Sequence, residues 1–256
     1  MSFHVGGGMR EELTSVGDVT SASDDDSLLV WAAQGFSARV RAWEHQQAVA
    51  VACPQLFKRN RLVVRGMGDA AADLVRHAHA ELGSSYHILA DASLLVELTA
   101  RLPGLHLRHV VLGWMEITGP LTDRTTTTGA GWLPDAELDD VRRLLDDAFP
   151  ESYAHPDEPG VLRWSGIRRN GALVAAAAEA WSAPQVGFVA GVVTTPRARG
   201  CGVATGLCHF LLTELVQDRG RAALMVDGWN ATAIGLYARL GLRYRTLGGG
   251  RLAGRS

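Results

Sequence analysis

Cysteine is scarce in this sequence, and its pattern indicates neither a cross-linked nor a metal-stabilised scaffold. The 256 residues include three cysteines, Cys53, Cys201 and Cys208, and no CxxC pair. An odd number argues against a disulfide framework, and the missing CxxC pairs argue against a structural zinc site. We therefore expect no metal and a reducing compartment.

An excess of charge and long apolar runs are also absent. Lys and Arg total 25 against 27 Asp and Glu, which gives no broad footprint for nucleic acid or an anionic membrane surface. No apolar run approaches the roughly 20 residues that span a bilayer, and no apolar segment follows a basic start. We expect a cytoplasmic protein that binds neither nucleic acid nor membrane, as a monomer or a homodimer.

The first half of the chain predicts a tail followed by a small domain. Residues 1–27 lack sustained aromatic or β-branched periodicity, which is typical of a mobile tail. Three short strand patterns lie between 38 and 65, and a helix–strand–helix–strand pattern covers 69–112. The stretch 118–131, with TTTTGAG inside it, is the expected linker, so the first domain is expected at 28–117.

The second half, residues 132–256, predicts another domain with the same mixture of elements. A helix pattern precedes three strand patterns between 162 and 194, whose turns indicate two consecutive hairpins. A helix follows over about 202–219, then a strand over 222–227, a helix over 231–240 capped by Asn230, and a last strand near 242–247. The expected fold class is α/β (α+β), with a mixed, mostly antiparallel sheet flanked by helices.

A glycine-rich loop, PRARGCGVA at 196–204, joins a predicted strand to the helix over 202–219. Its glycines permit close approach of the backbone, and the first N–H groups of a helix have no intrahelical partner. Arg197 and Arg199 add positive charge. The loop is therefore a candidate diphosphate cradle, and a tight turn on a basic surface patch is the alternative.

Two segments resemble fingerprints of the GNAT superfamily of N-acetyltransferases. VVTTPRARGCGVATGLCHFLL resembles the family's cofactor-binding segment, with its Arg/Gln-x-x-Gly-x-Gly/Ala pattern at Arg197, Gly200 and Gly202. NATAIGLYARLGLRY resembles the second fingerprint, in which an Asn caps a helix that carries a Tyr. The segments occur in the family's order, and the resemblance covers about residues 133–250.

The resemblance implies acetyl-CoA as cosubstrate and a primary amine as acceptor, which react by direct attack in a ternary complex. The acyl-CoA would lie in a wedge between the strand that ends at 192–194 and the next parallel strand. Backbone groups of 192–194 would pair with the pantetheine arm, and amides of about 199–205 would bind the pyrophosphate. The expected cofactor-binding residues are Val192, Val193, Thr194, Arg197, Arg199, Gly200, Cys201, Gly202, Val203, Ala204, Thr205 and Asn230.

Acyl transfer to an amine also requires a proton donor and a base. The resemblance implies that Tyr237 protonates the leaving thiolate, and a core role is the alternative. Cys201 has no histidine nearby in the sequence, so we expect it to lend an amide rather than act as a nucleophile. Glu179 is the first candidate base, Glu151 and His155 are further candidates, and a water relay is equally open.

The first half resembles a degenerate copy of the second. RGMG at 65–68 and RGCG at 199–202 each stand between a strand and a helix, and each is followed by a strand, a helix and a strand. This predicts two tandem GNAT-like halves, and chance alternation in an α/β protein is the alternative. Asp69 would repel a phosphate from the first loop, so we expect this half to shape the acceptor pocket or to replace a dimer partner.

Two other interpretations keep the loop and change the function. Gly200-x-Gly202-x-x-x-Gly206 resembles a dinucleotide fingerprint, with Asp227 ending the next strand. Against it, residues 195–199 separate these glycines from their strand, and too little chain follows for further βαβ units. A catalytically inactive acyl-CoA-binding or sensor module would keep the loop without turnover.

Overall fold

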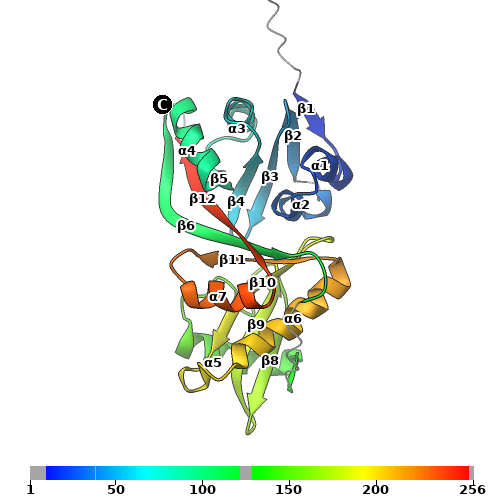
Figure 1. Ribbon diagram of the computed structural model, residues 1–256, viewed down its shortest axis with the longest axis vertical. Helices are drawn as coiled ribbons and strands as arrows, with labels where there is room; N and C mark the ends of the chain where they lie inside the picture. Colours follow the sequence, from blue (N-terminus) through cyan, green and yellow to red (C-terminus); the bar gives the residue numbers. More distant parts are fainter. Residues whose placement is uncertain (1–9, 38, 122–128, 254–256) are drawn as a thin grey trace, which may run out of the picture. The chain divides into compact units, whose positions relative to one another are not determined.

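The chain divides into two compact units whose boundary lies inside a strand. The structure is a computed structural model, which describes residues 10–37, 39–121 and 129–253. Unit 1 comprises Met1–Val111 and Leu247–Ser256, and unit 2 comprises Leu112–Thr246 (Figure 1). Strands β6 (Leu105–Ile117) and β12 (Arg243–Leu252) therefore contribute residues to both units.

This division differs from the expected domains at 28–117 and 132–256. The boundary falls at 111/112 rather than in a linker, and the C-terminal residues return to unit 1. Of the expected linker 118–131, residues 122–128 lie outside the described residues, and 130–132 form strand β7. The reason is long-range strand pairing, which a pass along the sequence does not reveal.

Unit 1 is a sheet with the strand order β1-β2-β3-β4-β5-β12, and helices pack against it. Its strands are β1 (Glu11–Leu13), β2 (Arg41–His45), β3 (Ala48–Leu56), β4 (Arg59–Arg65) and β5 (His87–Asp91), joined by the first part of β6 and the second part of β12. Its helices are α1 (Val16–Ala22), α2 (Ser27–Ala32), the 3-10 turn η1 (Gln34–Phe36), α3 (Gly68–Leu82) and α4 (Ala92–Arg101).

The segment expected as a mobile tail is partly folded. Strand β1 pairs antiparallel with β2, and α1 starts in a capping box formed by Ser15 and Asp18. Asp26 caps α2 by accepting hydrogen bonds from the first amides of that helix. The polar composition of residues 10–27 therefore supplies helix caps, which corrects the tail prediction for these residues. Residues 1–9 lie outside the described residues.

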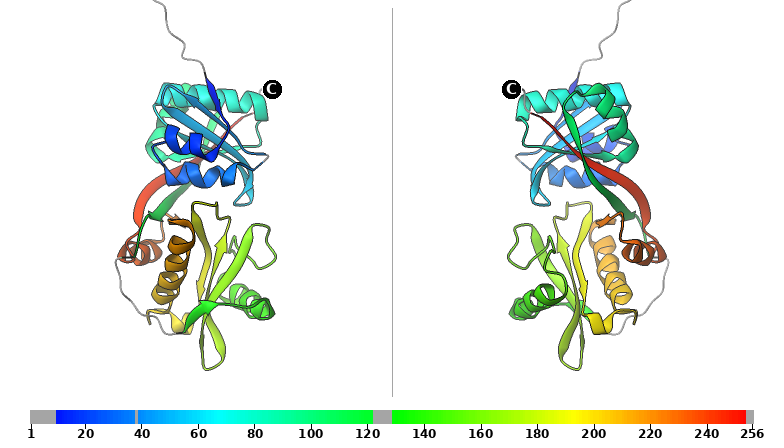
Figure 2. Two further views of the ribbon diagram at one scale, coloured as in Figure 1. Left: turned by 90° about the vertical axis from the view of Figure 1, so that its right-hand side faces the viewer. Right: turned by 90° about the vertical axis from the view of Figure 1, so that its left-hand side faces the viewer.

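The strands of unit 2 follow the order β6-β11-β10-β9-β8-β7 in the same 12-stranded sheet. Figure 2 shows α5 and α6 on opposite faces of this sheet. Its further strands are β7 (Ala130–Trp132), β8 (Val161–Arg169), β9 (Ala172–Ala180), β10 (Gly187–Thr194) and β11 (Ala222–Asp227). Its helices are the 3-10 turns η2 (Asp135–Glu137) and η3 (Pro196–Ala198), and α5 (Leu138–Ala148), α6 (Val203–Arg219) and α7 (Ala231–Arg239).

Alanines on β9 let both helices approach the sheet of unit 2. Ala175 and Ala177 belong to the core that α6 covers, together with Leu207 and Leu211. Because side chains alternate along a strand, the buried Ala176 and its even-numbered neighbours face the other side, and α5 also contacts β9. Because small residues on both faces of β9 let α5 and α6 pack closely, the neighbouring strand β10 also lies between these two helices.

The predicted fold class is confirmed. The sheet is mixed and mostly antiparallel, and the parallel pairs in the described part of the chain are β4–β5 and β10–β11. A dinucleotide-binding fold would need several parallel strands in succession. The pairing of β11 with β6 is antiparallel, so the dinucleotide interpretation has no structural support.

The same succession of elements occurs twice. A hairpin, a helix, a strand, a helix and a strand make up β3–β6 with α3 and α4, and again β9–β12 with α6 and α7. The parallel pairs align alike, since 61–63 pair with 87–89 and 187–189 pair with 222–224. The closing strands are exchanged, because β6 pairs with β11 through 112–117 and β12 pairs with β5 through 247–250.

Candidate active site

Strands β10 and β11 part after a short stretch of parallel pairing. Their register runs from Gly187↔Ala222 to Val189↔Leu224, although β10 continues to Thr194 and β11 to Asp227. On its other edge β10 stays paired with β9 as far as Thr194↔Ala175. The second half of β10 therefore has a strand partner on one edge only among the described pairs.

A β-bulge lies in the parted half of β10. The register with β9 shifts between Ala190 and Val193, and Gly191 has a φ of 62°. A Cβ placed on Gly191 would lie 2.8 Å from Cη2 of the buried Trp164 and 3.0 Å from Cβ of Ala154. Glycine is required here both by backbone conformation and by space. A glycine inside a strand pattern is a sequence signal for a bulge, and our sequence interpretation missed it.

The loop between α5 and β8 lies against this bulge. Ser152 is buried and donates a hydrogen bond of 2.8 Å to the carbonyl of Ala154, which holds the loop in place. The alternative base candidates Glu151 and His155 flank these residues, Glu151 exposed and His155 half-buried. Two of the predicted base candidates are therefore sequence neighbours of residues that pack on β10.

The predicted phosphate cradle forms the start of α6. After η3, Gly200 and Gly202 both have a φ of 72°, with open space where a side chain would stand. Gly202 is the N-cap of α6, and the described structure shows no side-chain hydrogen bond at this cap and no acidic residue in the first turn. The first intrahelical bond of this turn reaches the amide of Gly206. The preceding amides are therefore available to an anion.

Side chains around this cradle are mainly exposed. Arg197, Arg199 and Cys201 are exposed, whereas Val203 is buried under α6. The Nε of Arg199 donates to the carbonyl of Thr194 at 3.3 Å, which ties the loop to the end of β10. Ala204 and Thr205 are half-buried, as are Val192 and Thr194, and Val193 is buried. The cradle therefore offers backbone donors, with two exposed arginines in the same loop.

Asn230 and Tyr237 are both on α7. The side-chain oxygen of Asn230 accepts a hydrogen bond of 3.1 Å from the amide of Ala233, so Asn230 is the helix cap that the sequence predicted. Tyr237 is 7% exposed and belongs to the core beneath α6. Burial and the neighbouring Cys208 raise the pKa of Tyr237 well above its ordinary value, so the phenol keeps its proton.

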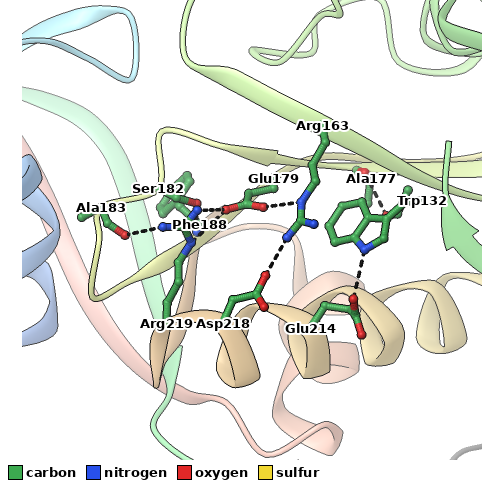
Figure 3. A network of polar contacts seen from close by, with 11 residues as sticks. Trp132, Arg163, Ala177, Glu179, Ser182, Ala183, Phe188, Glu214, Asp218 and Arg219 are labelled. Carbon is green, nitrogen blue, oxygen red and sulfur yellow. Dashed lines mark hydrogen bonds and ion pairs between the residues drawn. The ribbon is translucent and has the colours of Figure 1, made fainter. Parts of the chain in front are cut away.

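Glu179 lies in a network of ion pairs (Figure 3). Its carboxylate is 1% exposed, and its two oxygens accept hydrogen bonds from Arg163 at 2.7 Å and from Arg219 at 2.6 and 2.9 Å. Arg163 also pairs with Asp218 and lies over the ring of Trp132. Both carboxylate oxygens are thus engaged by cations, an arrangement that suits a structural anchor between β8, β9 and α6 better than a proton acceptor.

Replacing Glu179 with Gln tests this anchor. We expect the free energy of unfolding to fall by about 2–3 kcal/mol, because two partly buried guanidinium groups lose their shared carboxylate. Arg163 is 37% exposed, which places the loss at or just below the bottom of the range of about 3–5 kcal/mol for buried pairs. Urea denaturation measures the change.

The matched control is Asp218→Asn, which removes a half-exposed partner of the same Arg163. Its expected loss is below about 1 kcal/mol. An unchanged unfolding free energy in Glu179→Gln combined with loss of turnover would instead support the original prediction that Glu179 is the base.

The equivalent loop of the first repetition carries acidic groups. Asp69 in the first turn of α3 forms an ion pair with Arg101 at 2.6 Å. A Cβ on Gly68 would meet the side chains of Glu97 and Arg101, so this helix start is crowded by the chain itself. Two carboxylates at this position oppose phosphate binding, which favours the prediction of a degenerate first copy.

The described residues show neither a metal site nor a membrane-spanning helix. No group of three or more His, Cys, Asp or Glu side chains in the described ranges has an arrangement that could hold a metal ion. None of the helices within those ranges combines the length and apolar character needed to cross a bilayer.

In this α/β unit a parted parallel strand pair is followed by a helix start without a side-chain cap. Residues 131–242 match the acetyltransferase (GNAT) family. This part of the chain is therefore a GNAT acetyltransferase domain, as the fingerprints predicted, and acyl transfer is its general class of reaction. No curated protein sequence gives a significant match.

Solved structures of the same family share the fold. A GCN5-related N-acetyltransferase from Kribbella flavida is 22% identical, with a TM-score of 0.53 over 81% of this chain and 87% of that one. A GNAT-family acetyltransferase from Colwellia psychrerythraea is 11% identical, with a TM-score of 0.52 over 96% of this chain and 100% of that one. A putative GNAT acetyltransferase from Novosphingobium aromaticivorans is 24% identical, with a TM-score of 0.50 over 77% and 88%. At these identities the likeness concerns the fold alone.

Proposed function

We propose that this protein transfers an acetyl group from acetyl-CoA to a primary amine by direct attack in a ternary complex. The observation that carries the proposal is that β10 and β11 part toward their carboxyl ends. The chain leaves β10 there and enters the uncapped start of α6. Acetyl-CoA has a diphosphate and, at the end of a long arm, a thioester. A diphosphate cradle next to an open strand edge matches both features.

Backbone groups would make most of the contacts with the cosubstrate. The edge of β10 at Val192, Val193 and Thr194 is available to the amide groups of the pantetheine arm, in the manner of an added strand. Amides from about Arg199 to Thr205 would donate hydrogen bonds to the pyrophosphate, with positive charge from Arg197 and Arg199. Asn230 would border the arm from the α7 side.

The reaction needs a hydrogen-bond donor for the oxyanion, an acid that protonates the thiolate, and an acceptor for the proton of the amine. The amine nitrogen attacks the thioester carbon, and an amide at the bulge of β10 would donate to the oxyanion that forms. The carbon–sulfur bond then breaks, and Tyr237 would protonate the leaving thiolate, since its raised pKa keeps the phenol protonated. The proton lost by the amine would pass to water or to Glu151 or His155, because both oxygens of Glu179 are engaged by arginines.

An inactive acyl-CoA-binding module is the second candidate, and it differs only in turnover. The role proposed for Tyr237 separates the two candidates, because an inactive binder has no use for an acid at this position. A cytoplasmic location remains part of the proposal, since the three cysteines are free.

Calorimetric titration of acetyl-CoA tests the cofactor assignment. We expect one equivalent to bind per chain, because the first repetition's helix start carries its own carboxylates. NADH should bind more weakly than acetyl-CoA, because it shares the adenine and the diphosphate but lacks the pantetheine arm. Gly202→Glu should weaken binding by more than about tenfold, since it places bulk and negative charge in the cradle.

Gly220→Glu is the matched control for Gly202→Glu. Gly220 also has a positive φ and open space, but it ends α6 rather than beginning it. Its replacement should leave the affinity within about twofold of wild type. Failure of wild-type protein to bind acetyl-CoA would refute the proposed function, whereas binding without thiol release in an amine screen would favour the inactive module.

A further inference from the structure

One tryptophan stands apart from the others in its exposure. Trp229 is 79% exposed, although all seven tryptophans lie in the described ranges and five of them are at most 6% exposed. Trp132, the remaining one, is half-buried, with its indole N–H bonded to Glu214 and its ring under Arg163. A fully presented indole is a large apolar surface whose burial by a ligand is favourable.

The backbone around Trp229 is well fixed. The amide of Asn230 donates to the carbonyl of Asp227 at 2.9 Å, and the amide of Ala231 donates to the carbonyl of Trp229 at 3.0 Å. Asn230 then caps α7. The indole is therefore presented from a hydrogen-bonded turn between β11 and α7 rather than from a loose loop.

Trp229 also lies at the edge of the sheet where the phosphate cradle begins. β10 and β11 are parallel neighbours, so their carboxyl ends point toward the same edge. The chain leaves β10 through the glycine loop into α6, and it leaves β11 through Trp229 into α7. The exposed indole and the uncapped helix start thus follow adjacent strands of one unit.

We infer that Trp229 stacks on the adenine base of the coenzyme, an inference that rests on the proposed function. The adenine is the flat aromatic part of acetyl-CoA and is joined to the diphosphate that the cradle would bind. A flat base covers an indole more completely than the flexible pantetheine arm, which the edge of β10 would engage. Trp229 is then a binding residue that neither fingerprint contains, and it fixes the direction in which the nucleotide leaves the cradle.

Acrylamide quenching of tryptophan fluorescence tests the stacking, because Trp229 is the most accessible indole. ADP carries the adenine and diphosphate without the arm, and pantetheine carries the arm without the adenine. We expect ADP and acetyl-CoA to protect the quenchable indole and pantetheine to leave it unprotected. The quenchable component should be absent in Trp229→Phe.

Affinity measurements give the second readout. Trp229→Ala should weaken ADP and acetyl-CoA by the same factor, about tenfold, and Trp229→Phe should weaken them less. Trp132→Phe, a change at the half-buried tryptophan, is the control and should leave both affinities unchanged. Equal ADP affinity in wild type and Trp229→Ala, or protection by pantetheine alone, would overturn the stacking and leave the proposed function standing. Absence of acetyl-CoA binding to wild type would instead overturn the proposed function itself.

Discussion

Tyr237→Phe is expected to lower kcat by about 10²–10³-fold while acetyl-CoA affinity and the free energy of unfolding stay near wild type. The ring of Tyr237 packs in the core beneath α6, and Phe retains that ring. The substitution removes only the phenolic proton, whose transfer to a thiolate contributes within the usual range for general acids. Thiol release measures kcat, and calorimetry measures affinity.

The control for this substitution is Tyr244→Phe, because Tyr244 lies in the same unit but is 40% exposed on β12. We expect its kcat to be unchanged. Equal rates for wild type and Tyr237→Phe would exclude the acid role and return Tyr237 to a plain core position.

The pH dependence of kcat gives an independent check on Tyr237. Its pKa is raised, so the protonated acid persists at higher pH than for an exposed tyrosine. The rate should therefore not fall between about pH 9 and pH 11 through loss of this proton. An alkaline limb within that window that disappears in Tyr237→Phe would show that the pKa is not raised.

Local patterns were sufficient to predict the elements that carry the site. The strand at 222–227 and the helix after Asn230 begin where the sequence placed them, because turn residues and caps mark their ends. The position of the glycine loop was also predictable, because the loop consists of consecutive residues between a strand and a helix. The same holds for the mixed sheet, which follows from the order of hairpins and helices.

Contacts between distant residues were not predictable from these patterns. Arg163 and Arg219 lie 16 and 40 residues from Glu179, and nothing in a local pattern shows that both bind one carboxylate. The exchange of closing strands between the repetitions is of the same kind. Charges and strand partners far along the chain are decided by tertiary packing, so the base and the unit boundary were the weakest predictions.

The bulge in β10 leads to the last prediction, for Gly191→Ala. We expect the free energy of unfolding to fall by about 2–4 kcal/mol, since the new Cβ adds a positive-φ cost and presses on the buried Trp164 and on Ala154. We also expect kcat to fall by about 10²-fold in the folded protein, because relieving that contact moves the amide proposed to meet the oxyanion. Urea denaturation and thiol release give the two values.

Gly171→Ala separates backbone strain from these contacts. Gly171 has a φ of 79° in the β8–β9 turn, with open space around it, so an added Cβ there brings strain without a collision. Its expected cost is about 1 kcal/mol, and its kcat should remain that of wild type. If Gly191→Ala changes the unfolding free energy and kcat as little as Gly171→Ala does, the bulge has no role in catalysis. The oxyanion donor must then be sought at another amide. If Gly191→Ala loses kcat far beyond its loss of stability, Gly191 holds the amide in the position that acyl transfer requires.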